Sequence, residues 1–441
     1  MVSSLGTTTI RRFRPQHTPV DSGAGAGVSL SAPRFAIYNV RRCCRDAVPK
    51  TDRGRIMAER TALAGAPASR RLRRGWIALI VVVILVVVGA AVVWFGVKKL
   101  PGTHYAELDD TDQRMFTSLS TLYKQFQADP AAIWSTGYRF DEQPLTLIRR
   151  DEVGGVIWHY AYLINMSDVI DTTGMQKIDF PDGSLPEDVR VTKTLGTASL
   201  PFWAPFNFTI ETLGDTPVLT FKYSADVLDG AGDPAHEFGT FLLHEAFHVG
   251  KQQEWTYDRG AEGDRIFDYP TSAEQLAMLR TEFAILDSAT GVTDPARMEI
   301  AAHDLAQIRV ARYEKWPELR VQDNTEAIEG TAKYVERRMS DLTHGDINIL
   351  TTQPGGTATF VSVLDYIEEN EQFEILERDI AYETGAQLGY MLDVIEPTWK
   401  QKIEPAPTGE GLTPFQTLQR RVSVETAPTP QEILEIQARY P

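Results

Sequence analysis

Cysteine is nearly absent from this sequence: Cys43 and Cys44 are the only two among 441 residues. Proteins of oxidising compartments are often stabilised by disulfides between cysteines that are spread through the fold. Residues 45–441 contain no cysteine, so no disulfide can cross-link them. With 43% hydrophobic residues the chain can still build a core, and 441 residues are enough for two or three domains.

Basic residues are scarce beyond the first 75 positions. Residues 1–75 contain 15 Lys or Arg and 4 Asp or Glu, a net charge of +11, whereas the whole chain has a formal net charge of −16. Residues 76–441 therefore carry a net charge of −27. A region this acidic argues against nucleic acid or an anionic lipid surface as its partner.

Long hydrophobic runs are absent with one exception, Trp76–Val97, which has 22 residues and no charge. That length is sufficient for a helix to cross a bilayer. Four arginines stand just before the run and two lysines just after it, and the excess of positive charge marks the cytoplasmic side. We therefore predict a single-pass membrane protein with an uncleaved signal anchor. Residues 1–75 form a disordered basic cytoplasmic tail, residues 76–97 a transmembrane helix, and everything after Lys99 lies outside the cytoplasm.

Two other interpretations of the N-terminal region stay open. Residues 1–56 are rich in Ser, Thr, Gly, Pro and Arg and show no sustained periodicity, which is typical of disorder. The same Arg-rich and acid-poor composition is also typical of a transit peptide. Translation could also start at Met57, in which case the preceding stretch would not belong to the protein.

The hydrophobic pattern after the anchor predicts an α+β fold, with strands in residues 98–270 and helices in residues 271–441. The first region has a predicted helix over Tyr105–Ala128 and strands over Leu145–Arg149, Val156–Ile164 and Val189–Thr194. Phe206–Thr212 and Val218–Tyr223 flank a Gly214-Asp215 turn, which indicates a hairpin. The second region is predicted to be helical over Ala273–Ser288, Pro295–Arg312, Asp323–Met339, Phe360–Glu369, Asp379–Ile395 and Pro430–Tyr440, with a loop at Pro405–Pro414.

The segment with the clearest chemistry is His244-Glu245-Ala246-Phe247-His248, in a predicted helix that Asp233 would cap. Residues four apart lie one turn above each other on one helix face, so both imidazoles can bind one cation. Glu245 is turned by about 100° from His244, which leaves its carboxylate free to act on a metal-bound water. Two histidines with an open position for water suit Zn²⁺. The pattern resembles the active-site motif of the zincin metallopeptidases.

A third protein ligand is needed, and the best candidate is Glu329. The segment Glu329-Gly330-Thr331-Ala332-Lys333-Tyr334 resembles the Glu-Gly-x-Ala-x-Tyr segment of gluzincin aminopeptidase-like proteins, in which the Glu completes the zinc site. Glu326 is the alternative, although with Asp323 as N-cap it has the position of a capping box. The metzincin extension is absent, because Lys251 and Glu254 occupy the positions of its Gly and its third His.

The resemblance implies a zincin-like catalytic domain, with a mixed β-sheet followed by the active-site helix and then a mostly helical part. In such a domain Val218–Tyr223 is a candidate edge strand for an extended peptide, and an ordinary place inside the sheet is the alternative. The resemblance also implies a Tyr downstream of the Glu ligand that stabilises the oxyanion. Tyr382 is the candidate, with Gly385 leaving room for substrate, and packing of the ring in the core is the alternative.

This chain also departs from the family pattern. Eighty residues separate His248 from Glu329, and Lys333 occupies the position of the thermolysin-type Asp, so aminopeptidase activity is not implied. The function we expect is that of a membrane-anchored, zinc-dependent metallopeptidase. It would hydrolyse a peptide or protein substrate with Glu245 as general base. A catalytically inactive zinc-binding scaffold or interaction protein at the membrane is the main alternative. A metal hydrolase that acts on a non-peptide amide would use the same residues.

Overall fold

The computed structural model describes residues 81–86, 100–150, 158–181, 183, 185–193, 208–229, 238–257, 265–343, 345, 358–405 and 411–441. The chain divides into two compact units, residues 1–87 and residues 88–441. In the first unit only residues 81–86 are described, and they are helical. The predicted tail, most of the predicted transmembrane helix and Asp233 lie outside the described residues. Within the described part, no helix combines the length and the hydropathy needed to cross a membrane.

The described elements of the second unit are six strands and a larger set of helices. The strands are β1 Leu145–Arg150, β2 Trp158–Ile164, β3 Gln176–Lys177, β4 Val189–Thr192, β5 Phe208–Leu213 and β6 Thr216–Tyr223. The α-helices are α2 Asp110–Ala128, α3 Pro130–Ile133, α4 Ala225–Leu228, α5 Phe238–Gly250, α6 Ala273–Ala289, α7 Pro295–Lys315, α8 Val321–Thr325, α9 Thr331–Thr343, α10 Phe360–Asn370, α11 Ile380–Ile395, α12 Trp399–Ile403, α13 Pro414–Arg421 and α14 Pro430–Arg439. Shorter helical turns are η1 Tyr105–Glu107, η2 Phe140–Glu142, η7 Pro317–Arg320, the π-helical turn η8 Glu326–Gly330 and η9 Phe373–Glu377.

The six strands form one mixed sheet in the order β3-β4-β2-β1-β6-β5. All neighbouring strands are antiparallel except β1 and β6, which run parallel. β5 and β6 are joined by the two-residue turn Gly214-Asp215, in which Gly214 has a φ of +63°. Tight two-residue hairpins need a residue that tolerates positive φ. The predicted hairpin is therefore confirmed.

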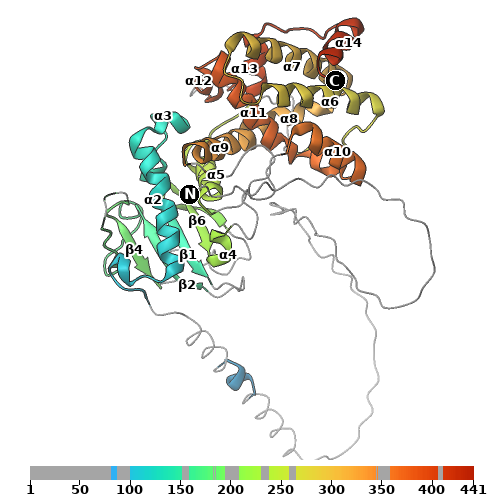
Figure 1. Cartoon of the computed structure of the whole chain (residues 1–441). Coiled ribbons are helices and arrows are strands. Elements are labelled where there is room, and N and C mark those ends of the chain that lie inside the picture. Colours follow the sequence, from blue (N-terminus) through green and yellow to red (C-terminus); the bar gives the residue numbers. More distant parts are fainter. Residues whose placement is uncertain are drawn as a thin grey trace, which may run out of the picture. The chain divides into compact units, whose positions relative to one another are not determined.

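Two helices cover one face of this sheet. Successive residues of a strand point to opposite faces, and the face that carries Tyr162 and Phe221 belongs to the main hydrophobic core. Phe116 of α2 contacts Tyr162 with ring centroids 4.7 Å apart, and Phe238 of α5 contacts Phe221 at 5.7 Å. Helix α5, which carries both predicted histidine ligands, is thus fixed beside β6 (Figure 1).

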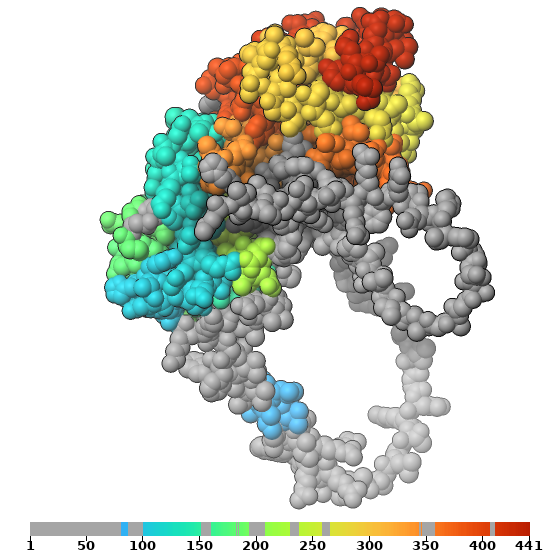
Figure 2. Space-filling view, viewed as in Figure 1, coloured from blue at the N-terminus to red at the C-terminus, as the bar shows by residue number. Residues whose placement is uncertain are grey.

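The helices from α6 onward form the second half of this unit. Figure 2 shows them, in yellow to red, as one closely packed body. Helix α11 contacts α7, α8, α9 and the π-turn, while α9 also contacts α2, α3 and α5. Several of these helices begin with a side-chain cap, in which a hydroxyl or carboxylate accepts a hydrogen bond from a first-turn N–H; the capping residues are Ser272, Asp294, Thr359, Thr413 and Thr429. Of the helices in the second half, α9 is therefore the one that packs most extensively against α5.

The α+β prediction is confirmed in its main features, two details of it are wrong, and two short helices were not predicted. Val218–Tyr223 is not an edge strand, because β6 pairs with β1 on one side and β5 on the other. The predicted helix over Asp323–Met339 is interrupted by the π-turn, and Asp323 lies inside α8 rather than at an N-cap. The helices that were not predicted are α12 and α13, which lie on either side of the predicted Pro405–Pro414 loop.

Candidate metal centre

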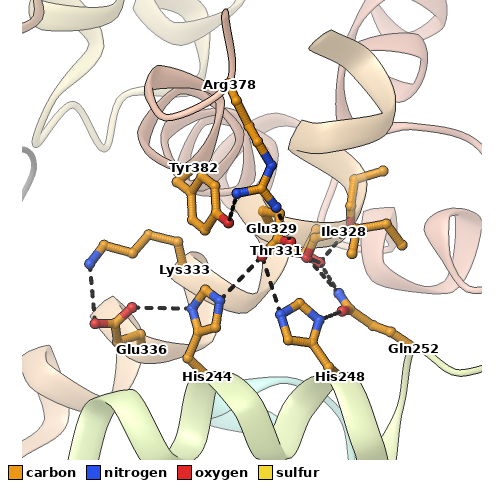
Figure 3. Close-up of polar contacts among 11 residues, drawn as sticks. His244, His248, Gln252, Ile328, Glu329, Thr331, Lys333, Glu336, Arg378 and Tyr382 are labelled. Carbon is orange, nitrogen blue, oxygen red and sulfur yellow. Dashed lines mark hydrogen bonds and ion pairs between the residues drawn. The ribbon is translucent and has the colours of Figure 1, made fainter. Parts of the chain in front are cut away.

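Helix α5 presents His244 and His248 from the same face, one turn apart, with ring centroids 5.0 Å apart. Both rings direct Nε2 toward Glu329, whose side chain comes down from the π-turn above them (Figure 3). Glu329 Oε2 lies 3.4 Å from His244 Nε2 and 3.2 Å from His248 Nε2. Among the residues that the structure describes, these three make up the group of His, Cys, Asp or Glu side chains that could hold a metal ion. We call them the metal centre.

The π-turn and two glycines place Glu329 over the histidines. A π-turn adds one residue to a helical turn and often occurs at functional sites. Here it lies against α11 so closely that a Cβ on Gly330 would be 2.6 Å from the Gly385 Cα, and one on Gly385 would be 2.8 Å from the Glu326 Cα. The missing side chain of Gly330 thus lets α11 approach the π-turn closely. The prediction that Gly385 leaves room for substrate is wrong, because Gly385 makes room for the π-turn.

The second nitrogen of each histidine ring is also held. His244 Nδ1 lies 3.3 Å from Glu336 Oε2, and Lys333 donates to the other oxygen of that carboxylate at 3.1 Å. His248 Nδ1 pairs with Gln252 Oε1 at 2.5 Å. The Gln252 amide in turn donates to the Ile328 carbonyl oxygen at 2.9 Å. Because an acceptor at Nδ1 holds the proton there, Nε2 is left with a lone pair for a cation.

Without a metal, protons take part of the place of a cation in this cluster. Burial lowers the pKa of His244, but hydrogen bonds to Glu329 and Glu336 outweigh that effect and raise the pKa to about 10. Burial likewise raises the pKa of Glu329, but its hydrogen bonds to the two histidines bring it well below the ordinary range. The carboxylate is thus ionised and faces the imidazoles.

Glu245 is buried next to His244 and is not one of the three residues of the metal centre. Burial raises its pKa, and the neighbouring imidazoles of His244 and His248 only partly oppose this shift. A carboxylate with a raised pKa is better matched to proton transfer near neutral pH than an ordinary one. Its position next to the first histidine is the one that the helical spacing predicts.

Tyr382 lies beside the metal centre, at the start of α11. Its ring stacks on the His244 ring at a centroid distance of 5.9 Å and an interplanar angle of 11°. Its hydroxyl oxygen accepts a hydrogen bond of 2.6 Å from Arg378, which also donates to Glu329 Oε1 at 2.7 Å. Burial raises the pKa of Tyr382, so its hydroxyl stays protonated at neutral pH.

Glu326, the alternative third ligand, belongs to a different cluster. Its carboxylate accepts hydrogen bonds from Arg309 at 2.7 Å, Gln322 at 2.9 Å and Thr384 at 2.6 Å, and its side chain is fully buried. It does not form the predicted capping box with Asp323, whose carboxylate instead accepts from Tyr313 at 2.6 Å. We call the group that contains Glu326 the ion-pair cluster; its charged members are Glu282, Arg309, Arg312 and Glu326.

The distances within the metal centre suit a cation better than a direct ion pair. Charge-assisted N–H···O bonds are about 2.7–2.9 Å long, shorter than the 3.2 and 3.4 Å found between Glu329 and the imidazoles. Bonds of about 2.0–2.1 Å in tetrahedral geometry put neighbouring ligand atoms about 3.3 Å apart. Two histidines and one carboxylate are a typical donor set of catalytic zinc, which keeps its fourth position open. The residues therefore fit a zinc ion.

Sequence reasoning did not identify three partners of this centre. Gln252 had a signal, because it follows His248 by four residues and so lies on the same helix face. Glu336 stands seven residues after Glu329, two helical turns on, but only the packing of α9 against α5 brings it to His244. Arg378 precedes α11 and is 49 residues from Glu329, and no local pattern marks it.

The comparisons with known proteins give no name to this arrangement: no protein-family model, no curated protein and no solved structure matches the chain.

Proposed function

We propose that the protein is a zinc-dependent metallopeptidase of the gluzincin type, with His244, His248 and Glu329 as metal ligands. The observation that supports this most strongly is the position of one carboxylate oxygen, Glu329 Oε2, at 3.4 and 3.2 Å from the two Nε2 atoms. The acceptors at both Nδ1 atoms add to it, because zinc-bound histidines usually donate their other N–H to such groups. Glu245 and Tyr382, which lie next to this centre, supply the other groups that the reaction needs.

A zinc ion held there would act as a Lewis acid and would lower the pKa of a water ligand toward neutrality. Glu245 would accept the proton of the attacking water and deliver it to the leaving amine, which a buried carboxylate of raised pKa can do. Tyr382 would donate its hydroxyl hydrogen to the oxygen on which negative charge develops. Its ring, stacked on His244, keeps the hydroxyl on the side of the metal centre.

The edge strand β5 is the element along which we propose that the substrate binds. β5 pairs only with β6 and has its other edge unpaired among the described strands. Phe208 of β5 contacts Phe241 with ring centroids 5.7 Å apart, and Phe241 precedes His244 by less than one turn of α5. An extended peptide can add to such an edge by main-chain hydrogen bonds. This role passes to β5 from β6, which the sequence had suggested.

The membrane anchor belongs to the proposal on the strength of the sequence alone. Residues 76–97 would tether the chain, with the basic tail in the cytoplasm and the catalytic unit on the opposite side. The net charge of −27 after residue 75 argues against a nucleic-acid partner.

The experiment that tests the proposal combines zinc analysis with digestion of a mixed peptide library. The variant Glu245→Gln should keep wild-type zinc but lower the rate of hydrolysis by about a hundredfold to ten-thousandfold, because an amide cannot accept the proton. Glu254→Gln is the matched control, because it makes the same change at an exposed residue nine positions along the chain. A wild-type chain that binds zinc but hydrolyses no peptide would support the scaffold instead.

A further inference from the structure

We propose that Arg378 is a positioning residue that holds the metal ligand Glu329 and the tyrosine Tyr382 in a fixed relation to each other. The inference rests on the proposed function and deepens it, because one guanidinium would orient both a metal ligand and a hydrogen-bond donor to the substrate.

Both terminal nitrogens of Arg378 are used within the site. Nη2 donates to Glu329 Oε1 at 2.7 Å and Nη1 donates to the Tyr382 hydroxyl at 2.6 Å, as Figure 3 shows. The central carbon of the guanidinium also lies over the Tyr382 ring, 5.1 Å from its centroid. A rigid, planar fork of donors suits this task, because it fixes the angle between its two partners. Because both terminal nitrogens bind these partners, Arg378 would act on the metal and the substrate only by orienting Glu329 and Tyr382.

The first consequence concerns the carboxylate of Glu329. Arg378 engages Oε1, while Oε2 faces the two imidazoles. A carboxylate can bind a metal through one or both oxygens, and the hydrogen bond to Oε1 favours binding through Oε2 alone. Binding through one oxygen keeps the number of protein ligands at three and leaves the fourth position open, as a catalytic zinc site requires.

The second consequence concerns the hydroxyl of Tyr382. A phenolic oxygen that accepts a hydrogen bond from an arginine must direct its own hydrogen to another group. The Tyr382 ring stacks on the His244 ring at a centroid distance of 5.9 Å, so the hydroxyl lies on the side of the metal centre. By occupying one side of this oxygen, Arg378 restricts the directions in which Tyr382 can donate its hydrogen.

The backbone around Arg378 is fixed on both sides. The preceding residue, Glu377, pairs with Arg265 and accepts a hydrogen bond of 2.9 Å from the Ile266 N–H at its carbonyl oxygen. The following turn starts α11, with Ala381 N–H donating to the Arg378 carbonyl oxygen at 3.0 Å. Because α11 also lies in close contact with the π-turn, the distance between Arg378 and Glu329 is set by backbone packing.

Arg378→Lys and Arg378→Met separate geometry from charge. Lysine keeps the positive charge but offers a single point of donation, so it cannot hold both partners. If Arg378 acts by positioning its partners, both variants should lose zinc affinity and turnover to the same extent. If Arg378 acts only through its positive charge, the lysine variant should keep the zinc affinity and turnover of the wild type. Arg280→Lys is the matched control, because Arg280 of α6 also bridges two acidic residues, Asp365 and Glu368 of α10, away from the metal centre.

The readouts are zinc affinity and the visible absorption of the Co²⁺-substituted chain, with turnover of peptide as a third. In both Arg378 variants we expect zinc affinity to fall by about tenfold to a hundredfold, and the Co²⁺ absorption to weaken as Oε1 becomes a second ligand atom. We expect kcat to fall more than KM rises, while Arg280→Lys matches the wild type. A wild-type Co²⁺ spectrum and zinc affinity in Arg378→Lys would overturn the inference alone. A wild-type chain that binds neither metal would overturn the proposed function together with it.

Discussion

Two buried polar clusters share the same short turn of the chain, and they differ in how their charges are matched. Glu326 and Glu329 stand three residues apart in the π-turn, yet one belongs to the ion-pair cluster and the other to the metal centre. In the ion-pair cluster Arg309 reaches Glu282 at 2.5 Å and Glu326 at 2.7 Å, and every charged side chain is fully buried. In the metal centre the corresponding nitrogen–oxygen distances are 3.2 and 3.4 Å.

The difference indicates which cluster is complete without a cation. Two arginines balance two glutamates in the ion-pair cluster, so its carboxylate oxygens already have donors at hydrogen-bond distance. In the metal centre Arg378 donates to Glu329 Oε1 at 2.7 Å, but Oε2 faces two imidazoles at 3.2 and 3.4 Å, with Glu245 as a further acid beside them. A buried carboxylate oxygen without a close donor is costly unless a proton or a metal compensates it. The first cluster therefore stabilises the helical half, and the second is suited to bind a cation.

The strongest test of this contrast is Glu326→Ala. Removing one partner from a fully buried ion pair leaves the other charge uncompensated, so the free energy of unfolding should fall by about 3–5 kcal/mol. Urea denaturation measures it. The control Glu299→Ala removes an exposed pair with Arg421 and should cost less than about 1 kcal/mol. A loss for Glu326→Ala no larger than that of the control would contradict the structural role of the ion-pair cluster.

A smaller effect is expected for Glu336→Gln, which tests the support of the metal centre. The amide no longer carries the charge that orients His244 through Nδ1, so zinc affinity should fall by about tenfold to a hundredfold. Competition with a chromophoric chelator measures the affinity. Glu299→Gln, the same change at an exposed ion pair, should leave it unaltered. Equal zinc affinity in both variants would show that Glu336 does not support the metal.

The contact between the π-turn and α11 can be tested with Gly385→Ala. A Cβ there would lie 2.8 Å from the Glu326 Cα, so backbone must shift. We expect the free energy of unfolding to fall by about 1–3 kcal/mol. Gly137→Ala is the control, because a Cβ at Gly137 would meet nothing within 4 Å, and its effect should stay within about 1 kcal/mol. Equal thermal stability of the two variants would rule out the tight crossing.

A further expected effect is a pH dependence that is confined to the metal centre. The folded, metal-free chain raises the pKa of His244 to about 10, above the ordinary value of about 6.5. The raised pKa stabilises the metal-free fold fully below about pH 6.5, and this contribution is lost as the pH rises through about 10. His244→Ala should therefore show a smaller loss of unfolding free energy between pH 7 and pH 10 than the wild type.

Zinc uptake provides an independent measure of the same proton. Since the metal replaces the proton at His244, zinc binding near pH 7 should release about one proton per ion. Calorimetry in two buffers of different ionisation enthalpy measures this release. Binding without proton release, or equal pH dependence of stability in wild type and His244→Ala, would contradict the assignment of this group.

What the sequence could predict depends on how local each feature is. The spacing of His244 and His248 and the Gly214-Asp215 hairpin are set within one helix or one turn, and both follow from residue spacing alone. The candidate ligand Glu329 came from a short motif that resembles a known one. Gln252 was within reach of the same helical reasoning, because it stands four residues after His248.

The features that could not be predicted depend on contacts between distant segments. The capping box at Asp323 was a sound local inference, but Tyr313 competes for the Asp323 carboxylate and the helix begins earlier. The edge of the sheet depends on the parallel pairing of β1 with β6, which are separated by more than 60 residues. Arg378 reaches Glu329 only because α11 crosses the π-turn at two glycines.

The measurement that tests the central claim most directly is the zinc content of the full-length chain and of two variants, Glu329→Gln and Glu326→Gln, after dialysis against a weak chelator. We predict about one zinc per wild-type chain, nearly none in Glu329→Gln, and the wild-type amount in the folded fraction of Glu326→Gln. A wild-type chain without zinc, or a Glu329→Gln chain that keeps all of it, would contradict the account.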